Sequence, residues 1–332
     1  MIPALALAQT LVLALAQPVA SAEASREAYL MGTRATLVAR AASRPEALSA
    51  LDALLRVLED TEQDLSTWRD TPFNRLNRAR PGEIAAVPPA LCELMGLLSD
   101  WTRRTGGTFD PAAGPLLDIW GVQTTARVPS HEEIIAALPA SRFSAWSFER
   151  SACTIRRPEH GRLDSGGFGK GEAIDRASAA AVPSAGWLID LGGQVGVWGV
   201  SPPGGWRVAV AHPRHRSRRL FDVRLTSGSI ATSGGSQRDQ RAGRARVGHI
   251  IDPRTGTPAT FGGSVVVWNE RGLVADILST ALYVMGPEQG LRWANAQGVS
   301  ACFLIPSGNR VRVRASDAFR QRFPSARRPV RS

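Results

Sequence analysis

Lysine and cysteine are both scarce in this chain. Of 40 Lys and Arg residues only Lys170 is a lysine, and it lies in the glycine-rich stretch RLDSGGFGKGEAID (162–175). Cys92, Cys153 and Cys302 are odd in number, far apart and without a C-x-x-C pair, which argues against a zinc site and a disulfide framework. The sequence therefore excludes a cysteine-rich protein and singles out one lysine.

Long apolar runs are absent after the first 22 residues. A transmembrane helix needs roughly 20 apolar residues, and only MIPALALAQTLVLALAQPVASA approaches that length. This stretch has no charge and ends on Ala-Ser-Ala, so we predict a signal peptide (1–22), a periplasmic mature protein and no stable membrane span after cleavage. The alternatives are an uncleaved N-terminal segment that holds the protein at the membrane and a misassigned start.

Acidic charge is in deficit, and the formal net charge is +11. Much of the excess lies in HPRHRSRR (212–219), RDQRAGRAR (238–246) and a basic C-terminal tail set at 316–332. Such clusters can bind nucleic acid or anionic membranes, but no interleaved aromatics or nucleic-acid motif accompany them. We predict a solvated basic face and no nucleic-acid partner, with His212 and His215 as surface members of the first cluster rather than metal ligands.

Helical and strand patterns alternate irregularly along the mature chain. Helical spacing of apolar residues predicts helices at 45–68, 89–104 and 273–286. Short strands separated by Gly, Pro and Ser turns are predicted in MGTRATLVAR, WLIDLGGQVGVWG, WRVAVAHP, FDVRLTSGSIATSGG, SVVVW and SACFLIPS. This order predicts an α+β fold, with one domain at 23–315.

The stretch around Lys170 matches none of the common phosphate-binding motifs. A P-loop needs a glycine where Asp164 stands and a Ser or Thr where Gly171 stands. The spacing G-x-G-x-x-G fails as well, and no G-x-S-x-G elbow is present. Glycines still let a backbone approach a phosphate closely, but on its own the stretch is equally typical of a tight turn with an exposed lysine.

Six further segments combine turn glycines with reactive side chains. They are MGT (31–33), GGTFDPAAGPLLDIWG (106–121), IDLGGQVGVWG (189–199), ATSGGSQR (231–238), GHIIDPRTGTP (248–258) and VADILSTALYVMG (274–286). In order and wording, together with the lysine stretch, they resemble the FAD:protein FMN transferase family, the ApbE-type proteins. The resemblance covers residues from about 31 to 290.

The resemblance implies an ApbE-like single domain with mixed or antiparallel sheets and packed helices. It implies an enzyme that binds FAD with Mg²⁺, cleaves the pyrophosphate, transfers FMN to a Thr or Ser hydroxyl of an acceptor flavoprotein and releases AMP. By family analogy the acceptor is a subunit of a membrane redox complex. The alternatives are an FAD pyrophosphatase, a non-catalytic periplasmic flavin-binding carrier, and a basic nucleic-acid or membrane-surface protein.

Carried over by motif position, the metal ligands are the backbone carbonyl of Gly167 and the side chains of Asp276 and Thr280. The last two stand at i and i+4, so they share one helical face, and their hard oxygens suit Mg²⁺. Without the resemblance, a surface aspartate and a threonine bonded to its own helix are the simpler interpretation.

The resemblance also assigns a set of FAD-binding positions. They are Met31, Trp68, Thr108, Phe109, Asp110, Asp164, Lys170, Gly192, Gly193, Thr232, Ser233 and Gly234. The chain departs from the family pattern at Trp68, where tyrosine is common, in TPFNRLN (71–77), and at Ser236, where an aromatic is frequent. These departures affect expected contacts at the edges of the substrate.

Three side chains are candidates for the chemistry. His249 and Asp276 are the candidate bases, because a hydroxyl nucleophile gains from a nearby proton acceptor. Lys170 is expected to hold FAD and stabilise charge on its phosphates, since a compact ammonium fits a glycine turn that a planar guanidinium does not. The alternative for His249 is a hydrogen bond that only stabilises the turn in HIIDP.

Overall fold

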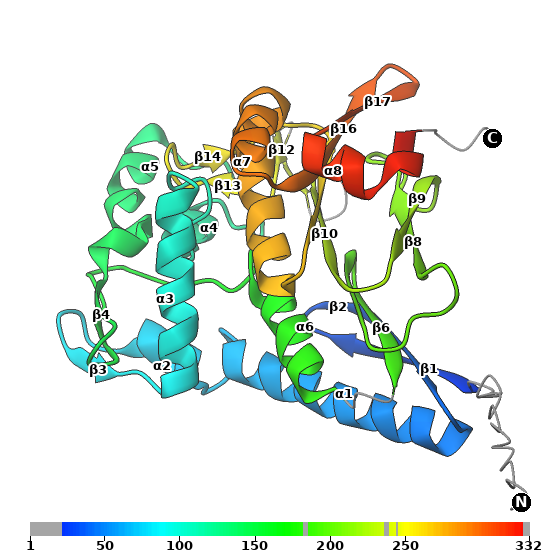
Figure 1. Ribbon diagram of the computed structural model, residues 1–332. Helices are drawn as coiled ribbons and strands as arrows, with labels where there is room; N and C mark the ends of the chain where they lie inside the picture. Colours follow the sequence, from blue (N-terminus) through cyan, green and yellow to red (C-terminus); the bar gives the residue numbers. More distant parts are fainter. Residues whose placement is uncertain (1–21, 182–184, 236–238, 244, 328–332) are drawn as a thin grey trace, which may run out of the picture.

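The computed structural model describes residues 22–181, 185–235, 239–243 and 245–327 (Figure 1). Residues 1–21 of the predicted signal peptide lie outside that part. Among the helices of the described ranges, none is long and apolar enough to cross a membrane.

An eight-stranded antiparallel sheet forms the centre of the fold. Its strands follow the order β1 (Ala22–Leu30), β2 (Thr33–Ala41), β6 (Gly186–Leu191), β7 (Gln194–Trp198), β10 (Gly228–Gly234), β15 (Ser264–Asn269), β16 (Ser300–Ser307) and β17 (Arg310–Ala315). Alternation along β15 shows how the faces divide: Val265 and Val267 pack under a helix, whereas Val266 and Trp268 face the opposite layer. Both faces of the sheet are therefore covered.

Three helices cover one face and a hairpin covers the other (Figure 1). The helices are α1 (Arg44–Leu65), α6 (Gly169–Ala180) and α7 (Gly272–Ala296). The opposite layer contains the hairpin β8 (Trp206–Ala211) and β9 (Arg219–Leu225), with α8 (Asp317–Arg322) and η3 (Pro324–Arg327) beside it. This arrangement of helices and antiparallel sheets confirms the predicted α+β fold.

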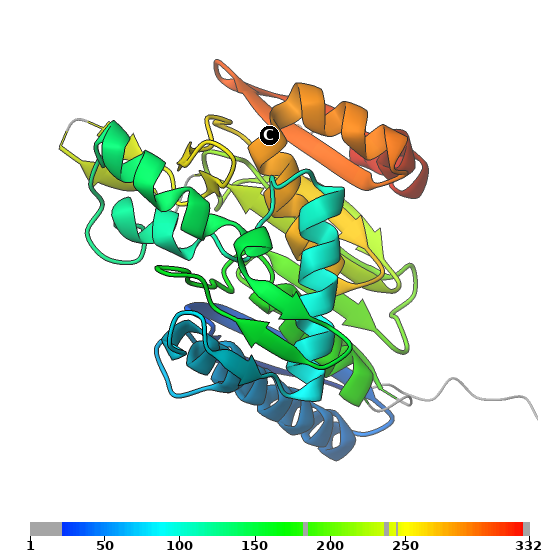
Figure 2. The ribbon, with the colours of Figure 1, turned by 90° about the vertical axis from the view of Figure 1, so that its left-hand side faces the viewer.

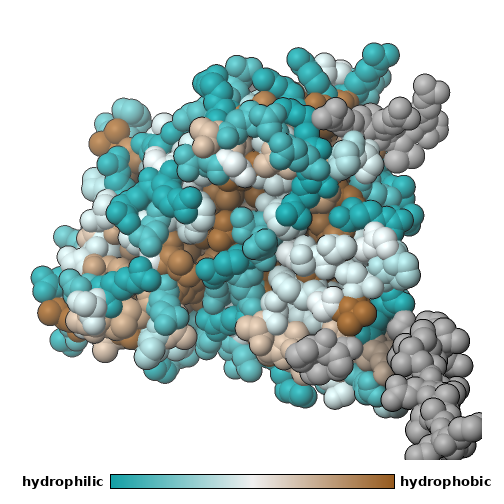
Figure 3. All heavy atoms as spheres, in the orientation of Figure 1, coloured by the Kyte–Doolittle hydropathy of each residue, from teal (hydrophilic) through white to brown (hydrophobic). Residues whose placement is uncertain are grey.

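A second lobe packs against the outer side of α7, with α3 in front in Figure 2. It contains α2 (Pro72–Arg78), α3 (Pro89–Arg104), α4 (Gly114–Ile119), α5 (His131–Ala137), η1 (Pro139–Ser141), η2 (Phe143–Ala145) and a small sheet of β3 (Ile84–Ala86), β5 (Thr154–Arg156) and β4 (Ser147–Glu149). Short pairs β11 (Gln240–Ala242) with β12 (Ala245–Val247) and β13 (Ile251–Asp252) with β14 (Thr257–Pro258) complete the fold. Hydrophobic atoms gather in the hollow between α3 and α7 (Figure 3).

Helix α7 lies between the lobe and the sheet, and its sequence reflects this position. Ile277 packs into the lobe core and Leu278 into the core under the sheet. A helix that is buried on both sides is apolar nearly all round. The predicted helix at 273–286 ends at the kink at Gly286, where φ is 72°, but the chain resumes helical structure from Pro287 to Ala296.

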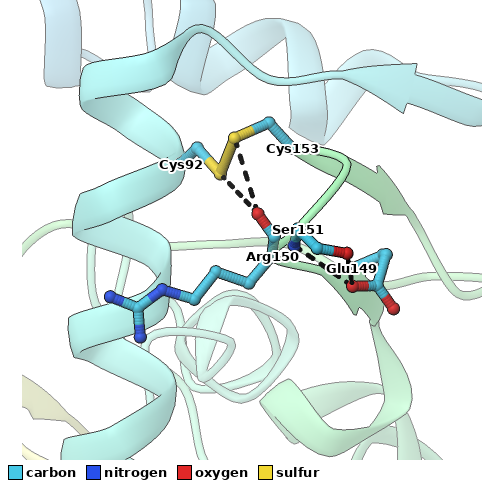
Figure 4. The surroundings of a disulfide bond; sticks show 5 residues. All are labelled: Cys92, Glu149, Arg150, Ser151 and Cys153. Atoms are coloured by element: carbon cyan, nitrogen blue, oxygen red, sulfur yellow. Dashed lines mark hydrogen bonds between the residues drawn. A yellow bond between two sulfur atoms is a disulfide. The ribbon is translucent and has the colours of Figure 1, made fainter.

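A disulfide between Cys92 and Cys153 joins α3 to the turn before β5 (Figure 4). The cysteine pattern does not predict this bond, because the two cysteines are separated by 61 residues. The small sheet β3-β5-β4 brings them together, whereas Cys302 stays free and buried in β16. The expectation of no disulfide is therefore wrong.

The stretch set apart as a basic tail is folded over its described part. Ser316 caps α8 by accepting a hydrogen bond from Phe319 N–H at 3.2 Å. Phe319, Phe323 and Ala326 are buried against the β8–β9 hairpin. The described part of this stretch is thus held by apolar packing against the hairpin.

Candidate active site

A cavity of about 790 Å³ opens between the second lobe, α7 and the ends of the sheet strands. Segments far apart in the sequence form its wall: the GGTFD turn, the glycine stretch before α6, the β6–β7 turn, the end of β10, residues near the β12–β13 connection, and α7. The cavity is therefore a product of the whole fold.

The structure brings most of the predicted residues to this one cavity. The lining includes Thr108, Phe109, Asp110, Asp164, Gly167, Lys170, Gly192, Gly193, Thr232, Ser233, Gly234, His249, Asp276 and Thr280. Met31 and Trp68 are not part of the lining. Trp68 is 70% exposed. Met31 packs against Gly169 in the glycine stretch, where an added Cβ would lie 3.4 Å from the Met31 Cε atom.

The β6–β7 turn needs two consecutive glycines. Gly192 and Gly193 have φ values of 62° and 97°, and a Cβ on Gly192 would lie 2.2 Å from Thr33 Oγ1. Asp190 Oδ1 accepts the N–H of Gly193 at 2.9 Å and fixes the turn. Bare backbone is thereby presented to the cavity, where a ligand can approach it closely.

The glycine stretch is a turn that leads directly into α6, a helix that the sequence pattern does not predict. Before the turn, the side chain of Asn77 in α2 makes two hydrogen bonds with the backbone of Leu163. Its Nδ2 donates to the Leu163 carbonyl at 3.0 Å, and its Oδ1 accepts the Leu163 N–H at 2.7 Å. The divergent segment TPFNRLN thus forms α2 and positions the turn. Ser236, the other divergent position, lies outside the described residues.

Asp276 is buried in α7 and faces the first turn of α6. It is 4% exposed, and its Oδ2 atom accepts the N–H of Gly171 at 3.0 Å. A Cβ on Gly171 would lie 2.8 Å from the Cβ of Asp276 and 2.3 Å from the carbonyl oxygen of Gly272. The alternative of a surface aspartate is therefore wrong, because a close helix contact encloses this carboxylate.

Gly167 and Thr280 lie beside one another near Asp276. A Cβ on Gly167 would be 3.6 Å from Thr280 Cγ2, and all three residues line the cavity. Their donors are one carboxylate, one hydroxyl and one backbone carbonyl; in the described ranges no group of three or more His, Cys, Asp or Glu could hold a metal. This donor set fits a hard cation that takes further ligands from water or phosphate, such as Mg²⁺, and does not fit zinc.

Lys170 lies in the first turn of α6 and is half-buried at the cavity wall. Over the described ranges its ammonium forms no ion pair, whereas Glu172 in the same turn pairs with Arg176 at 2.8 Å. Backbone N–H groups at a helix N-terminus add positive potential there. This wall of the cavity is suited to an anionic group.

Asp110 and Asp164 are the acidic members of the lobe side. Burial raises the pKa of Asp110 to about 6, although its carboxylate accepts N–H bonds from Ala112 and Phe143 at 2.9 and 3.0 Å. Asp164 Oδ2 accepts a hydrogen bond from Gln123 at 2.6 Å. Neither carboxylate carries an ion pair closer than 3.9 Å within the described ranges.

His249 lies at the other side of the cavity, beside Asp239. Its ring Nδ1 is 3.0 Å from Asp239 Oδ1, and its backbone N–H donates to the same oxygen at 3.3 Å. Sequence reasoning missed Asp239, as well as Asp190 and Arg216, which also line the cavity. Asp190 stands in the family segment IDLGGQVGVWG but was not singled out, whereas Asp239 and Arg216 lie outside the family segments and only the fold brings them to the wall.

His212 is buried beside the predicted basic cluster rather than exposed on its surface. It is 7% exposed and its Nδ1 accepts the N–H of Arg214 at 3.1 Å, so its assignment to a solvated face is wrong. Burial, followed by the nearby positive charges of His215 and two arginines, lowers the pKa of His212. His215 is exposed, with its ring centroid 5.1 Å away.

The fold and cavity define an α+β protein whose central antiparallel sheet is covered on both faces and which has a cavity suited to an anionic ligand between sheet and lobe. The model of the ApbE family matches residues 31–303. The chain belongs to the ApbE family.

Individual relatives agree with this assignment. The FAD:protein FMN transferase of Rhodobacter capsulatus is 32% identical over 313 residues, which cover 91% of this chain but only 59% of that protein. The FAD:protein FMN transferase of Vibrio cholerae is 29% identical over 276 residues, covering 80% of this chain and 82% of that one. The crystal structure of the ApbE protein from Thermotoga maritima superimposes with a TM-score of 0.83 at 26% identity, covering 91% of this chain and 99% of that one.

Proposed function

We propose that this protein is an FAD:protein FMN transferase that moves FMN from FAD to a Thr or Ser hydroxyl of an acceptor flavoprotein and releases AMP. The observation that carries the proposal is the convergence of the family motifs, from six separate segments, on one cavity of about 790 Å³. That volume lies in the range of sites for small molecules and cofactors. The curated relatives bear the name of the same activity.

The cavity offers different chemistry on its different walls. Bare backbone at Gly192 and Gly193 and the glycine turn before α6 let a pyrophosphate approach closely. Lys170 supplies a mobile positive charge for the phosphates. Thr108 and Phe109, on the lobe side, are the residues that we expect to hold the flavin or adenine part of FAD.

Transfer requires one bond to form and one to break. The acceptor oxygen forms a bond to the phosphorus of the FMN half, and the bond from that phosphorus to the bridging oxygen breaks, with its electron pair leaving on AMP. The hydroxyl proton passes to a base, for which His249 is our first candidate and Asp276 the second. Such reactions depend mainly on positioning and charge neutralisation.

We propose that Gly167, Asp276 and Thr280 hold Mg²⁺. When bound, the cation supplies charge neutralisation at the phosphate oxygens. Among these three residues Asp276 provides the carboxylate, and its hydrogen bond from Gly171 fixes it in orientation. The residues of the chain itself then bind FAD, orient the acceptor hydroxyl and take up its proton.

We further propose a periplasmic location, with a subunit of a membrane redox complex as the acceptor. The Cys92–Cys153 disulfide supports an oxidising compartment, because such bonds persist mainly outside the cytosol. The uncharged stretch at 1–22 supports export.

The test is product analysis with purified protein, FAD and Mg²⁺, with and without an acceptor domain that bears a threonine. We expect AMP release that depends on the acceptor, stops with a chelator and is lost in Asp276→Ala. FMN and AMP released equally without acceptor would instead assign an FAD pyrophosphatase. FAD that is bound but unchanged in every condition would assign a carrier.

A further inference from the structure

Asp239 contacts His249 through both its ring and its backbone. Oδ1 lies 3.0 Å from Nδ1 and 3.3 Å from the backbone nitrogen. Oδ2 is held separately by Arg246, whose Nε lies at 3.1 Å. The side chain of Asp239 is 9% exposed and that of His249 is 21% exposed, so solvent competes little for these contacts. The carboxylate therefore has one oxygen for the imidazole and one for the guanidinium.

This contact decides which ring nitrogen of His249 carries the proton. A carboxylate accepts hydrogen bonds and does not donate them, so the neutral imidazole must place its proton on Nδ1. The lone pair is then on Nε2, the nitrogen that does not face Asp239. Burial opposes ionisation of Asp239, but the hydrogen bonds from His249 and the charges of His249 and Arg246 outweigh it and lower its pKa.

We propose that Asp239 is a positioning residue: it fixes His249 as the Nδ1–H tautomer and stabilises the imidazolium after Nε2 takes the proton of the acceptor hydroxyl. This inference rests on the proposed function, because it assigns the base of the same transfer. The electron pair of the cleaved phosphorus–oxygen bond leaves with AMP, as above, and the proton on Nε2 is later lost to solvent.

A purely structural role for Asp239 is the competing explanation, since the residue also anchors Arg246. Arg246 donates to the carbonyl of Gly235 at 2.8 Å and to Asp239, and its side chain is 65% exposed. Tyr283 is a further titratable group close to Asp239; burial, with the charge of Asp239, raises its pKa to about 12, so it stays neutral. Arg246→Gln breaks the structural contact and leaves the histidine contact, which makes it the matched control.

The kinetic test compares Asp239→Asn, Arg246→Gln and His249→Ala, alone and combined. General base catalysis contributes about 10²- to 10⁴-fold, so we expect Asp239→Asn to lower kcat for FMN transfer about 30-fold or more, with FAD affinity within about twofold of wild type. Arg246→Gln should stay within about threefold. Added to His249→Ala, Asp239→Asn should cause no further loss, because it acts through the missing ring.

A further drop in that double variant, or an Arg246→Gln variant as slow as Asp239→Asn, would overturn the inference. Asp239→Glu should recover part of the activity, because it restores the carboxylate.

A second readout does not depend on turnover. The chain has five histidines, so ¹⁵N spectra of labelled protein resolve each ring, and His249→Ala assigns the signal of interest. At pH 8 we expect His249 to be protonated on Nδ1 in the wild type and to mix tautomers in Asp239→Asn. A wild-type ring protonated on Nε2 would overturn the inference, whereas the expected tautomer in a protein that transfers no FMN would overturn the proposed function alone.

Discussion

Lys170 shows how a single residue type can be diagnostic in this chain. All other basic residues of the Lys/Arg type in this chain are arginines, and the single lysine lies in the first turn of α6, at the wall of the cavity. Guanidinium is larger, planar and rigid, so we expect Lys170→Arg to weaken FAD binding about tenfold and to slow transfer. Titration of flavin fluorescence measures the affinity, and Lys170→Met should bind still more weakly. Full affinity and full rate in the arginine variant would contradict the role given to the ammonium.

Asp110 makes stability depend on pH in a direction that is unusual for an aspartate. Burial raises its pKa from 3.8 to about 6, so the folded state binds the proton more tightly than the unfolded chain. The stabilisation is complete below about pH 4 and is lost as pH rises through 6, on the order of 3 kcal/mol. Relative to Asp110→Asn, the ligand-free wild type should lose unfolding free energy between pH 4 and 7 in urea titrations. Parallel pH profiles of the two proteins would contradict this.

At the scale of elements, the contact between α6 and α7 determines where Asp276 lies. Gly171→Ala would place a Cβ 2.3 Å from the Gly272 carbonyl oxygen, so the helices must separate. Overpacking of this kind costs about 1–3 kcal/mol, and the shift should also lower metal-dependent activity at least tenfold. Gly262→Ala is the control, because a Cβ there meets nothing within 4 Å. Thermal unfolding and AMP release measure both effects, and equal behaviour of the two variants would refute the account.

Elements with strong periodicity were predictable from the sequence, and elements that depend on tertiary contacts were not. The helix at 89–104 matches α3, and the one at 45–68 corresponds to α1, which ends at Leu65. By contrast, α6 begins at Gly169 in a glycine-rich stretch, and β17 alternates arginine with small apolar residues at the sheet edge. The local helix propensity of α6 and the local strand propensity of β17 are weak. Packing on α7 stabilises α6, and pairing with β16 stabilises β17.

The residues of the candidate site likewise fall into those that the sequence predicted and those that only the tertiary structure reveals. Asp276 and Thr280 were predicted from the family resemblance, with their i and i+4 spacing on one helix face as support, and most motif residues line the cavity. Asp239 was missed, because it lies outside the family motifs and the β11–β12 strand pair separates it from His249, ten residues further along the chain. The Cys92–Cys153 pair was missed for a similar reason, since spacing alone cannot reveal a bridge of 61 residues.

At the scale of the whole molecule, the disulfide ties α3 of the lobe to the small sheet. Closing a loop of this length in the unfolded chain is worth about 4 kcal/mol in the chain-entropy treatment. We expect a reductant to lower the Tm of the wild type by several degrees, and Cys92→Ser/Cys153→Ser to unfold at the same lowered temperature with or without reductant. An unchanged wild-type Tm under reducing conditions, with the free thiols verified by mass, would contradict this stabilisation.

The whole molecule acts, in this account, by holding FAD between sheet and lobe while an acceptor protein presents its hydroxyl at the open side of the cavity. The measurement that tests this most directly is the intact mass of a threonine-bearing acceptor domain after incubation with the mature protein, FAD and Mg²⁺. We predict a gain of one FMN moiety, with AMP released in equal amount and both lost in Asp276→Ala. An acceptor of unchanged mass, whether FAD is split or left whole, would contradict the assignment as an FMN transferase.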